Sequence, residues 1–118
     1  WESENITDKN SYVYTIMIRQ PDFVTEDVAA KAVEIAKKKK PHPYISEAEF
    51  CEAEDGLSIQ ILHIGDYDDE PRSFAQLQAY MAEKGLRRKN NAHREIYLTD
   101  ASKTERDKNI TVLRYNVI

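Results

Sequence analysis

The chain has 118 residues, 41% of them hydrophobic, which is enough for one domain with a core of its own. Its 17 basic and 21 acidic residues give a net charge of -4, so it lacks the positive field that attracts nucleic acid or an anionic membrane. One cysteine excludes an internal disulfide, and no stretch resembles a membrane span or a signal peptide. We therefore expect a single cytoplasmic domain over residues 1–118 with neither a nucleic-acid nor a membrane partner.

The first part of the chain predicts a strand followed by a helix. Residues 11–19, SYVYTIMIR, are rich in β-branched and aromatic residues and end before Pro21, which indicates a strand. Thr25 is a suitable N-cap for a helix over residues 26–39. The acidic first turn and lysine-rich last turn of this helix complement its dipole, which we favour over a nucleic-acid patch because the chain is acidic overall.

The middle of the chain predicts a hairpin. Residues 45–53 alternate weakly between apolar and polar side chains, and an Asp-Gly turn then leads into an apolar run over residues 57–64. Both segments are predicted to be strands.

A second helix and two further strands complete the chain. Pro71 suits the first turn of a helix, Phe74, Leu77 and Met81 form its apolar stripe, and Gly85 suits its end. Two more strands are predicted, over residues 91–99 and 110–117. The order β-α-β-β-α-β-β predicts an α+β fold, an antiparallel sheet with the two helices on one face.

Polar and aromatic side chains gather on the predicted strand that follows the second helix. The strand period of two sends Ile96 and Leu98 to one face and His93, Glu95 and Tyr97 to the other. We expect the first face to be core and the second to carry chemistry. A solvated strand face alternates in the same way, and periodicity alone favours that interpretation.

The sequence lacks the common enzyme signatures. It contains no glycine-rich phosphate loop, no His-Glu-x-x-His, no Cys-x-x-Cys and no Gly-x-Ser-x-Gly. The three histidines, His42, His63 and His93, are too widely spread to define a zinc site. We therefore predict neither a metal ion nor a cofactor.

Two motifs carry a family resemblance. The segments His63-x-Gly65-x-Tyr67 and Glu95-x-Tyr97-Leu98-x-Asp100, separated by a helix, resemble the GyrI-like small-molecule-binding family. This family also includes the effector-binding domains of some multidrug-responsive transcription regulators. The implied fold is a pair of pseudo-symmetric strand-helix-strand-strand units whose sheets flank a groove.

The resemblance extends over most of the chain. Residues 57–118 match one whole unit, and the segment from Tyr14 onward resembles the stand-alone bacterial members. One more strand and helix of the first unit would precede Trp1, so we expect the first unit to be truncated here. A homodimer would complete the groove with a second copy, and the alternative is an incomplete pocket.

The resemblance also implies a ligand class and a set of site residues. Members bind lipophilic, often aromatic or cationic, small molecules, with a groove glutamate that corresponds to Glu95. The candidate ligand-binding residues are Trp1, Tyr14, His63, Tyr67, Glu95 and Tyr97. His63 and Tyr67 have the alternative of packing, and Tyr97 that of pairing across strands with Tyr115.

Some stand-alone members are implied to hydrolyse cyclopropane-bearing, DNA-alkylating natural products. In that reaction Glu95 would be the general base, its pKa raised by desolvation, and Tyr67 or Tyr97 would donate a proton to the developing oxyanion. The alternative is a non-catalytic binding or sensing module that resembles the regulator effector domains. The sequence leaves both open.

Overall fold

The structure, a computed structural model, describes residues 12–118 and divides them into two units. Residues 12–14 and 55–118 form one unit, here called the sheet unit, and residues 15–54 form the other, the α1 unit. The single domain expected over residues 1–118 stays a prediction.

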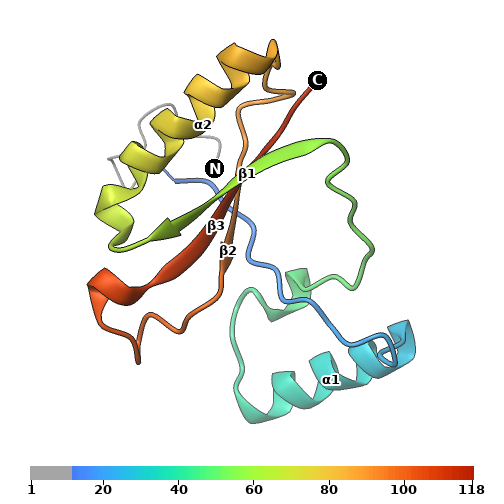
Figure 1. Cartoon of the computed structure of the whole chain (residues 1–118). Coiled ribbons are helices and arrows are strands. Elements are labelled where there is room, and N and C mark those ends of the chain that lie inside the picture. Colours follow the sequence, from blue (N-terminus) through green and yellow to red (C-terminus); the bar gives the residue numbers. More distant parts are fainter. Residues whose placement is uncertain (1–11) are drawn as a thin grey trace. The chain divides into compact units, whose positions relative to one another are not determined.

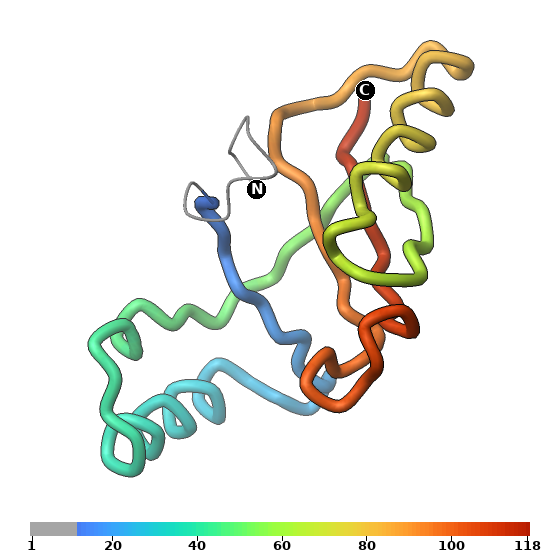
Figure 2. The backbone as a smooth tube through the Cα atoms, turned by 90° about the vertical axis from the view of Figure 1, so that its left-hand side faces the viewer, coloured from blue at the N-terminus to red at the C-terminus, as the bar shows by residue number. Residues whose placement is uncertain are grey.

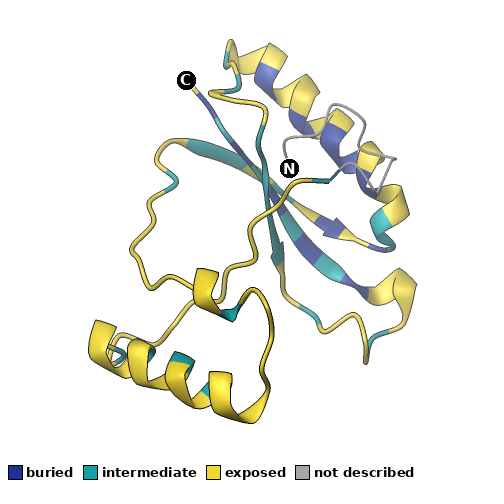
Figure 3. Ribbon diagram, turned by 180° about the vertical axis from the view of Figure 1, so that it is seen from behind, coloured by how far each residue is buried: buried dark blue, intermediate teal, exposed yellow. Residues whose placement is uncertain are grey.

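The α1 unit contains the first predicted helix, α1 (Glu26–Lys39). The Thr25 hydroxyl accepts a hydrogen bond from the backbone N–H of Val28, so the N-cap predicted from the sequence is present. No residue of α1 is buried, and its ribbon is coloured mainly as exposed in Figure 3. The residues at which this helix begins and ends are therefore explained by its N-cap and its terminal charges rather than by burial of its side chains.

The sheet unit contains three antiparallel strands in the order β1-β3-β2 (Figure 1). These are β1 (Ser58–Ile64), β2 (Arg94–Tyr97) and β3 (Ile110–Asn116). The central strand β3 brings the outer strands into one register, with Leu113 opposite both Ile61 and Glu95. Residues paired in this way share a face of the sheet, so β1 and β2 contribute side chains to the same layer.

The helix α2 (Glu70–Lys84) covers one face of this sheet (Figure 1). Its predicted stripe is confirmed: Phe74, Leu77 and Met81 are buried in one cluster with Leu113 and Tyr115 of β3. The dark segments of α2 in Figure 3 mark the buried positions of this helix. The helix ends at Gly85, whose φ of 67° is the left-handed conformation that glycine adopts without strain. The core consists of Phe74, Leu77, Met81, Leu113, Tyr115 and Val117.

The α+β class and the antiparallel sheet are confirmed, but the strand order differs in detail because two predicted strands are absent from residues 12–54. Residues 12–19 form no ladder, and Ile16 and Ile18 are each 79% exposed. Residues 45–53 begin with the short 3-10 helix η2 (Ile45–Glu47) and continue without regular structure. High β-propensity yields a strand only where a neighbouring strand supplies hydrogen bonds, and no such neighbour pairs with these segments in the described part of the chain.

The prediction for the two faces of β2 was wrong. Glu95 and Tyr97 lie opposite the buried residues Leu113 and Thr111, on the face that α2 covers. Ile96 lies opposite Val112 on the other face, where Leu62 and Ile64 of β1 are exposed. The polar face of β2 is therefore the inner one, because the end of α2 that covers it supplies polar partners as well as apolar ones.

Candidate functional site

Glu95 is the centre of a polar group between β2 and α2. Its side chain is only 5% exposed, and it accepts hydrogen bonds from the Tyr97 hydroxyl at 2.7 Å and from the His93 Nε2 at 3.0 Å. The three residues share one face because the strand period is two, as the sequence predicted. A carboxylate withdrawn from water in this way needs such partners, because an unpaired buried charge is costly.

Glu70, the first residue of α2, is a further member that the sequence analysis missed. The residue is 5% exposed, and its carboxyl group is in hydrogen-bonding contact with that of Glu95. The helical period contained the signal, since Glu70 precedes the buried Phe74 by four residues and Leu77 by seven. In the sequence alone, Glu70 is an acid at a helix N-terminus, a common position that does not indicate a site.

Two tyrosines form an aromatic edge beside the carboxyl groups. The rings of Tyr67 and Tyr97 meet edge to face, with centroids 5.8 Å apart. Tyr67 is the first residue of the short 3-10 helix η3 (Tyr67–Asp69), and Tyr97 is 57% exposed. We call the group Tyr67, Glu70, His93, Glu95 and Tyr97 the carboxyl cluster.

His63 lies beneath this edge as a structural residue. It is fully buried; its Nε2 donates to the Asp66 carbonyl at 2.8 Å and its Nδ1 accepts from the Ser73 hydroxyl at 2.7 Å. A carbonyl can only accept, so the Nε2 carries the hydrogen. His63 thus fixes the turn that precedes Tyr67, which matches its packing alternative rather than direct ligand contact.

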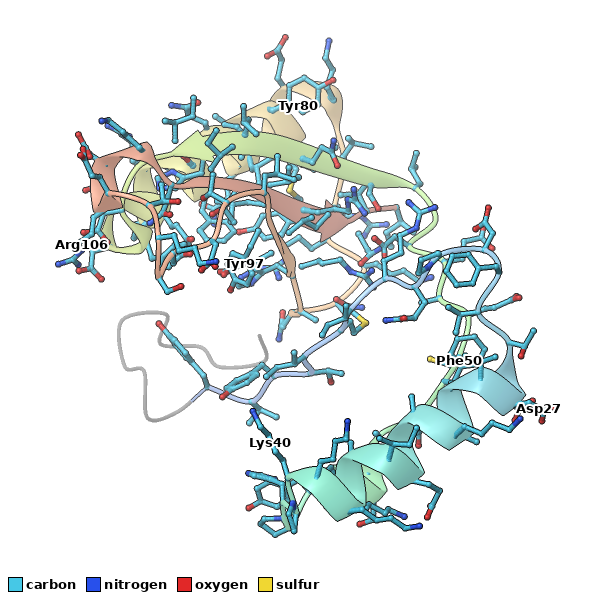
Figure 4. The ribbon with its side chains drawn as sticks, turned by 90° about the horizontal axis from the view of Figure 1, so that it is seen from below. Asp27, Lys40, Phe50, Tyr80, Tyr97 and Arg106 are labelled. Atoms are coloured by element: carbon cyan, nitrogen blue, oxygen red, sulfur yellow. The ribbon has the colours of Figure 1, made fainter. Side chains whose placement is uncertain are left out.

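The same turn is tied to the connection between β2 and β3, and Figure 2 shows the two segments side by side. Arg106 forms ion pairs with Asp66 at 2.8 Å and Asp68 at 3.5 Å. Arg106 and Tyr97, both labelled in Figure 4, lie at the same end of the sheet unit. The position of Tyr67 is therefore held from two sides.

The two carboxyl groups of the cluster have opposite pKa shifts. Burial, followed by the negative charge of Glu95, raises the pKa of Glu70 from 4.5 to about 9. Burial also acts to raise the pKa of Glu95, but the hydrogen bonds from His93, Tyr97 and Glu70 outweigh it and lower the pKa. The expectation that desolvation would raise the pKa of Glu95 was wrong, because it did not count these donors.

Both phenols of the cluster are held in the protonated form. Burial, followed by the nearby carboxylates, raises the pKa of Tyr67. Burial and the hydrogen bond to Glu95 raise the pKa of Tyr97 well above its usual value. Both hydroxyls are therefore available as hydrogen-bond donors at neutral pH.

The structure brings together Tyr67, Glu95 and Tyr97 but not all of the predicted site. Trp1 lies outside the described residues. Tyr14 is 65% exposed, and no hydrogen bond or ring contact with another described residue joins it to the carboxyl cluster. The register places Tyr97 opposite Thr111 rather than Tyr115, so the cross-strand alternative for Tyr97 was wrong.

The described residues contain no other recognisable kind of site. Residues 12–118 contain no group of three His, Cys, Asp or Glu side chains arranged to hold a metal ion. No helix within them has the length and apolar character that crossing a membrane requires. A shallow hollow of about 310 Å³ is lined by Arg19, Gln20, Pro21 and Asp22 and includes no member of the carboxyl cluster.

The chain is similar to solved structures from Listeria innocua. An uncharacterized conserved protein is 40% identical, with a TM-score of 0.76, and the match covers 85% of this chain and 50% of that one. A protein described as a hydrolase is 38% identical, with a TM-score of 0.73, and the match covers 85% of this chain and 52% of that one. The chain thus spans about half the length of these relatives.

No curated protein matches the chain significantly. The model of the GyrI-like small molecule binding domain matches residues 1–114, which is nearly the whole sequence. The motifs around Tyr67 and Glu95 fall within this match, as does the sheet unit except for its last four residues. The chain therefore belongs to the GyrI-like small-molecule-binding domain family.

Proposed function

We propose that the carboxyl cluster binds lipophilic aromatic or cationic small molecules. The observation on which this depends is the Glu95 carboxylate, nearly buried and hydrogen-bonded, beside the ring of Tyr97, which is more than half exposed. The membership of a small-molecule-binding family supports the same conclusion.

A flat cation satisfies such a site in two ways. Its charge offsets the cost of holding a carboxylate away from water, and its delocalised ring gains cation–π attraction to Tyr67 and Tyr97. Aromatic surfaces impose little hydrogen-bond geometry, so ligands of different shapes are accommodated. We therefore expect broad selectivity among flat cations.

The second part of the proposal is hydrolysis of a cyclopropyl-dienone. The oxygen of water forms a bond to a cyclopropane carbon while one C–C bond of that ring breaks. The electron pair of the broken bond moves through the conjugated system to the carbonyl oxygen, which takes up a proton and becomes a phenol. Glu95 accepts the proton that water loses, and a tyrosine donates the proton that the oxygen takes up. Glu95 then releases its proton and the tyrosine regains one through solvent, so the sum is the addition of one water molecule.

The geometry favours Tyr67 as the proton donor. The Tyr97 hydroxyl already donates to Glu95, whereas the Tyr67 hydroxyl makes no hydrogen bond to another residue in the range 12–118. The lowered pKa of Glu95 keeps it ionised and able to accept a proton, although it makes Glu95 a weaker base than the sequence implied. A relative described as a hydrolase supports this reaction class.

Mass spectrometry of a neutral cyclopropyl-dienone incubated with the chain tests the reaction. We expect the water adduct to appear faster with the native chain than without protein, and Glu95→Gln to abolish this acceleration. Binding of the neutral substrate should largely survive in Glu95→Gln, because it depends on shape. Glu83→Gln, an exposed change on α2, is the matched control.

The second candidate is a non-catalytic binding or sensing module, which the same cluster supports. In that case the native chain binds the dienone without accelerating adduct formation. Equal loss of binding and turnover in Glu95→Gln would contradict the role of Glu95 as base. Pairing with a second copy is also proposed, and sedimentation of the chain with and without ligand tests it.

A further inference from the structure

Glu70 has a buried oxygen whose environment does not suit an ionised carboxylate. Its Oε1 is inaccessible to solvent and receives no hydrogen bond from any described residue. The carboxyl group of Glu70 contacts that of Glu95, which is itself only an acceptor when ionised. Two ionised carboxylates in contact would repel each other and leave this oxygen unsatisfied.

One proton resolves this arrangement. Glu95 already accepts hydrogen bonds from His93 and Tyr97, so it is well suited to be the anion of the pair. A proton on the carboxyl group of Glu70 turns this group from an acceptor facing an acceptor into a donor to Glu95, and a neutral carboxylic acid loses less than a carboxylate does when one of its oxygens is buried without a donor. The opposite assignment would place the proton on the carboxyl group that already has two donors.

We propose that Glu70 is a neutral carboxylic acid in the folded protein, donating its O–H to Glu95, so that the pair carries one negative charge and selects ligands with one positive charge. This selectivity rests on the proposed ligand-binding function of the cluster. The protonation of Glu70 does not, because it follows from the ligand-free geometry. Glu70 acts on ligands through Glu95 and is a positioning residue.

The electrostatic surroundings agree with this assignment. Burial and the charge of Glu95, with a smaller effect from Asp68, raise the pKa of Glu70 to about 9. Among the described residues, the other titratable groups around the pair are Tyr67 from η3, and Tyr97 and His93 on the Glu95 side. The N-terminus of α2 favours the ionised form of Glu70, but burial beside a carboxylate outweighs it.

Within residues 12–118, the remaining neighbouring elements add no cation to this pair. β1 contributes His63 to the start of α2, with both ring nitrogens engaged by Ser73 and Asp66. β3 contributes Thr111, which is not ionisable in this range. Arg106, on the connection before β3, is paired with Asp66 and Asp68.

Titration of the wild-type chain by NMR, with ¹³C-labelled glutamate side chains, tests the protonation directly. We expect one carboxyl resonance to have the chemical shift of a protonated carboxyl group at pH 7 and to titrate near pH 9. This resonance should be absent from Glu70→Gln. Glu83→Gln should retain it. Ionised positions for every glutamate carboxyl at pH 7 would overturn the proposal, and this result needs no variant to fold.

Ethidium and propidium test the charge selectivity, since they share one ring system and carry one and two positive charges. Between pH 7 and pH 10 we expect propidium affinity to rise about fivefold or more relative to ethidium, as Glu70 ionises. The relative gain should be absent in Glu70→Gln. If the affinity for propidium relative to ethidium is already at its full value at pH 7, the pair does not carry a single negative charge there, and the proposal is contradicted. If one glutamate titrates near pH 9 but neither dye binds, the proposed binding function is refuted, whereas the proposed protonation of Glu70 stands.

Discussion

At the scale of single residues, the three histidines of this chain have different roles that only their contacts distinguish. His63 uses both ring nitrogens inside the sheet unit, His93 bonds Glu95, and His42 is exposed and accepts a hydrogen bond from the backbone of Tyr44. Sequence spacing excluded a zinc motif but did not separate these roles, because each depends on residues far along the chain.

His63→Ala should lower the free energy of unfolding by about 2–4 kcal/mol, because it leaves a cavity and removes the partners of Ser73 and the Asp66 carbonyl. Urea unfolding followed by circular dichroism measures the change. His42→Ala is the control and should stay within about 0.5 kcal/mol. Equal effects of the two substitutions would contradict the structural role of His63.

Tyr97→Phe should raise the pKa of Glu95, because it removes a hydrogen bond that stabilises the ionised carboxylate. Carbon-detected NMR titration of the glutamate carboxyl groups measures the shift. Tyr80→Phe, on the outer side of α2, should leave the Glu95 titration unchanged. An unaltered Glu95 in Tyr97→Phe would show that this bond does not stabilise the anion.

The part of the candidate site that lies on one strand could be predicted from the sequence. The motif and the period of two placed His93, Glu95 and Tyr97 together, and the structure keeps them together. Glu70 was missed because its partner is 25 positions away in the sequence, and only the packing of α2 on the sheet brings the two into contact. The direction of the Glu95 pKa shift was missed because it depends on that contact and on its other donors.

At the scale of elements, prediction succeeded where packing and local signals agree. In α2, the proline near the start, the apolar stripe and Gly85 all indicate one helix, and all three have the expected positions. Residues 12–19 and 45–53 carried local β signals without a pairing partner within residues 12–118, and no strand formed. Strand pairing is a property of two segments, so one segment's composition does not determine it.

The two helices differ in burial, since α2 buries an apolar stripe whereas no residue of α1 is buried. Leu77→Ala should lower the free energy of unfolding by about 2–5 kcal/mol, because Leu77 is buried against β3. Ile35→Ala in α1, where no residue is buried, should change it by less than about 0.5 kcal/mol. Chemical denaturation of both variants measures the difference, and a large effect at Ile35 would reveal packing that the α1 unit alone does not contain.

At the scale of the whole molecule, stability should depend on pH through Glu70. The folded chain keeps the Glu70 proton up to about pH 9, whereas the unfolded chain loses it near 4.5. The unfolded state thus binds fewer protons across this window, so the free energy of unfolding falls as pH rises through it. Glu95, with its lowered pKa, contributes stability above 4.5 that is lost as pH falls further.

The matched comparison is wild type against Glu70→Gln, with unfolding measured between pH 5 and 9. We expect the stability of the wild type to decline relative to the variant as pH rises, since glutamine has no proton to lose. Parallel pH profiles would show that Glu70 titrates alike in the folded and unfolded chains.

We propose that the buried Glu95 carboxylate recognises a cationic aromatic ligand. Calorimetric titration of ethidium into the wild-type chain, Glu95→Gln and the Glu83→Gln control tests it most directly. We predict that Glu95→Gln weakens binding by about tenfold or more, because the cation loses its charge partner, while Glu83→Gln binds as the wild type does. Equal affinity in all three proteins would contradict the claim and place ligand recognition outside the carboxyl cluster.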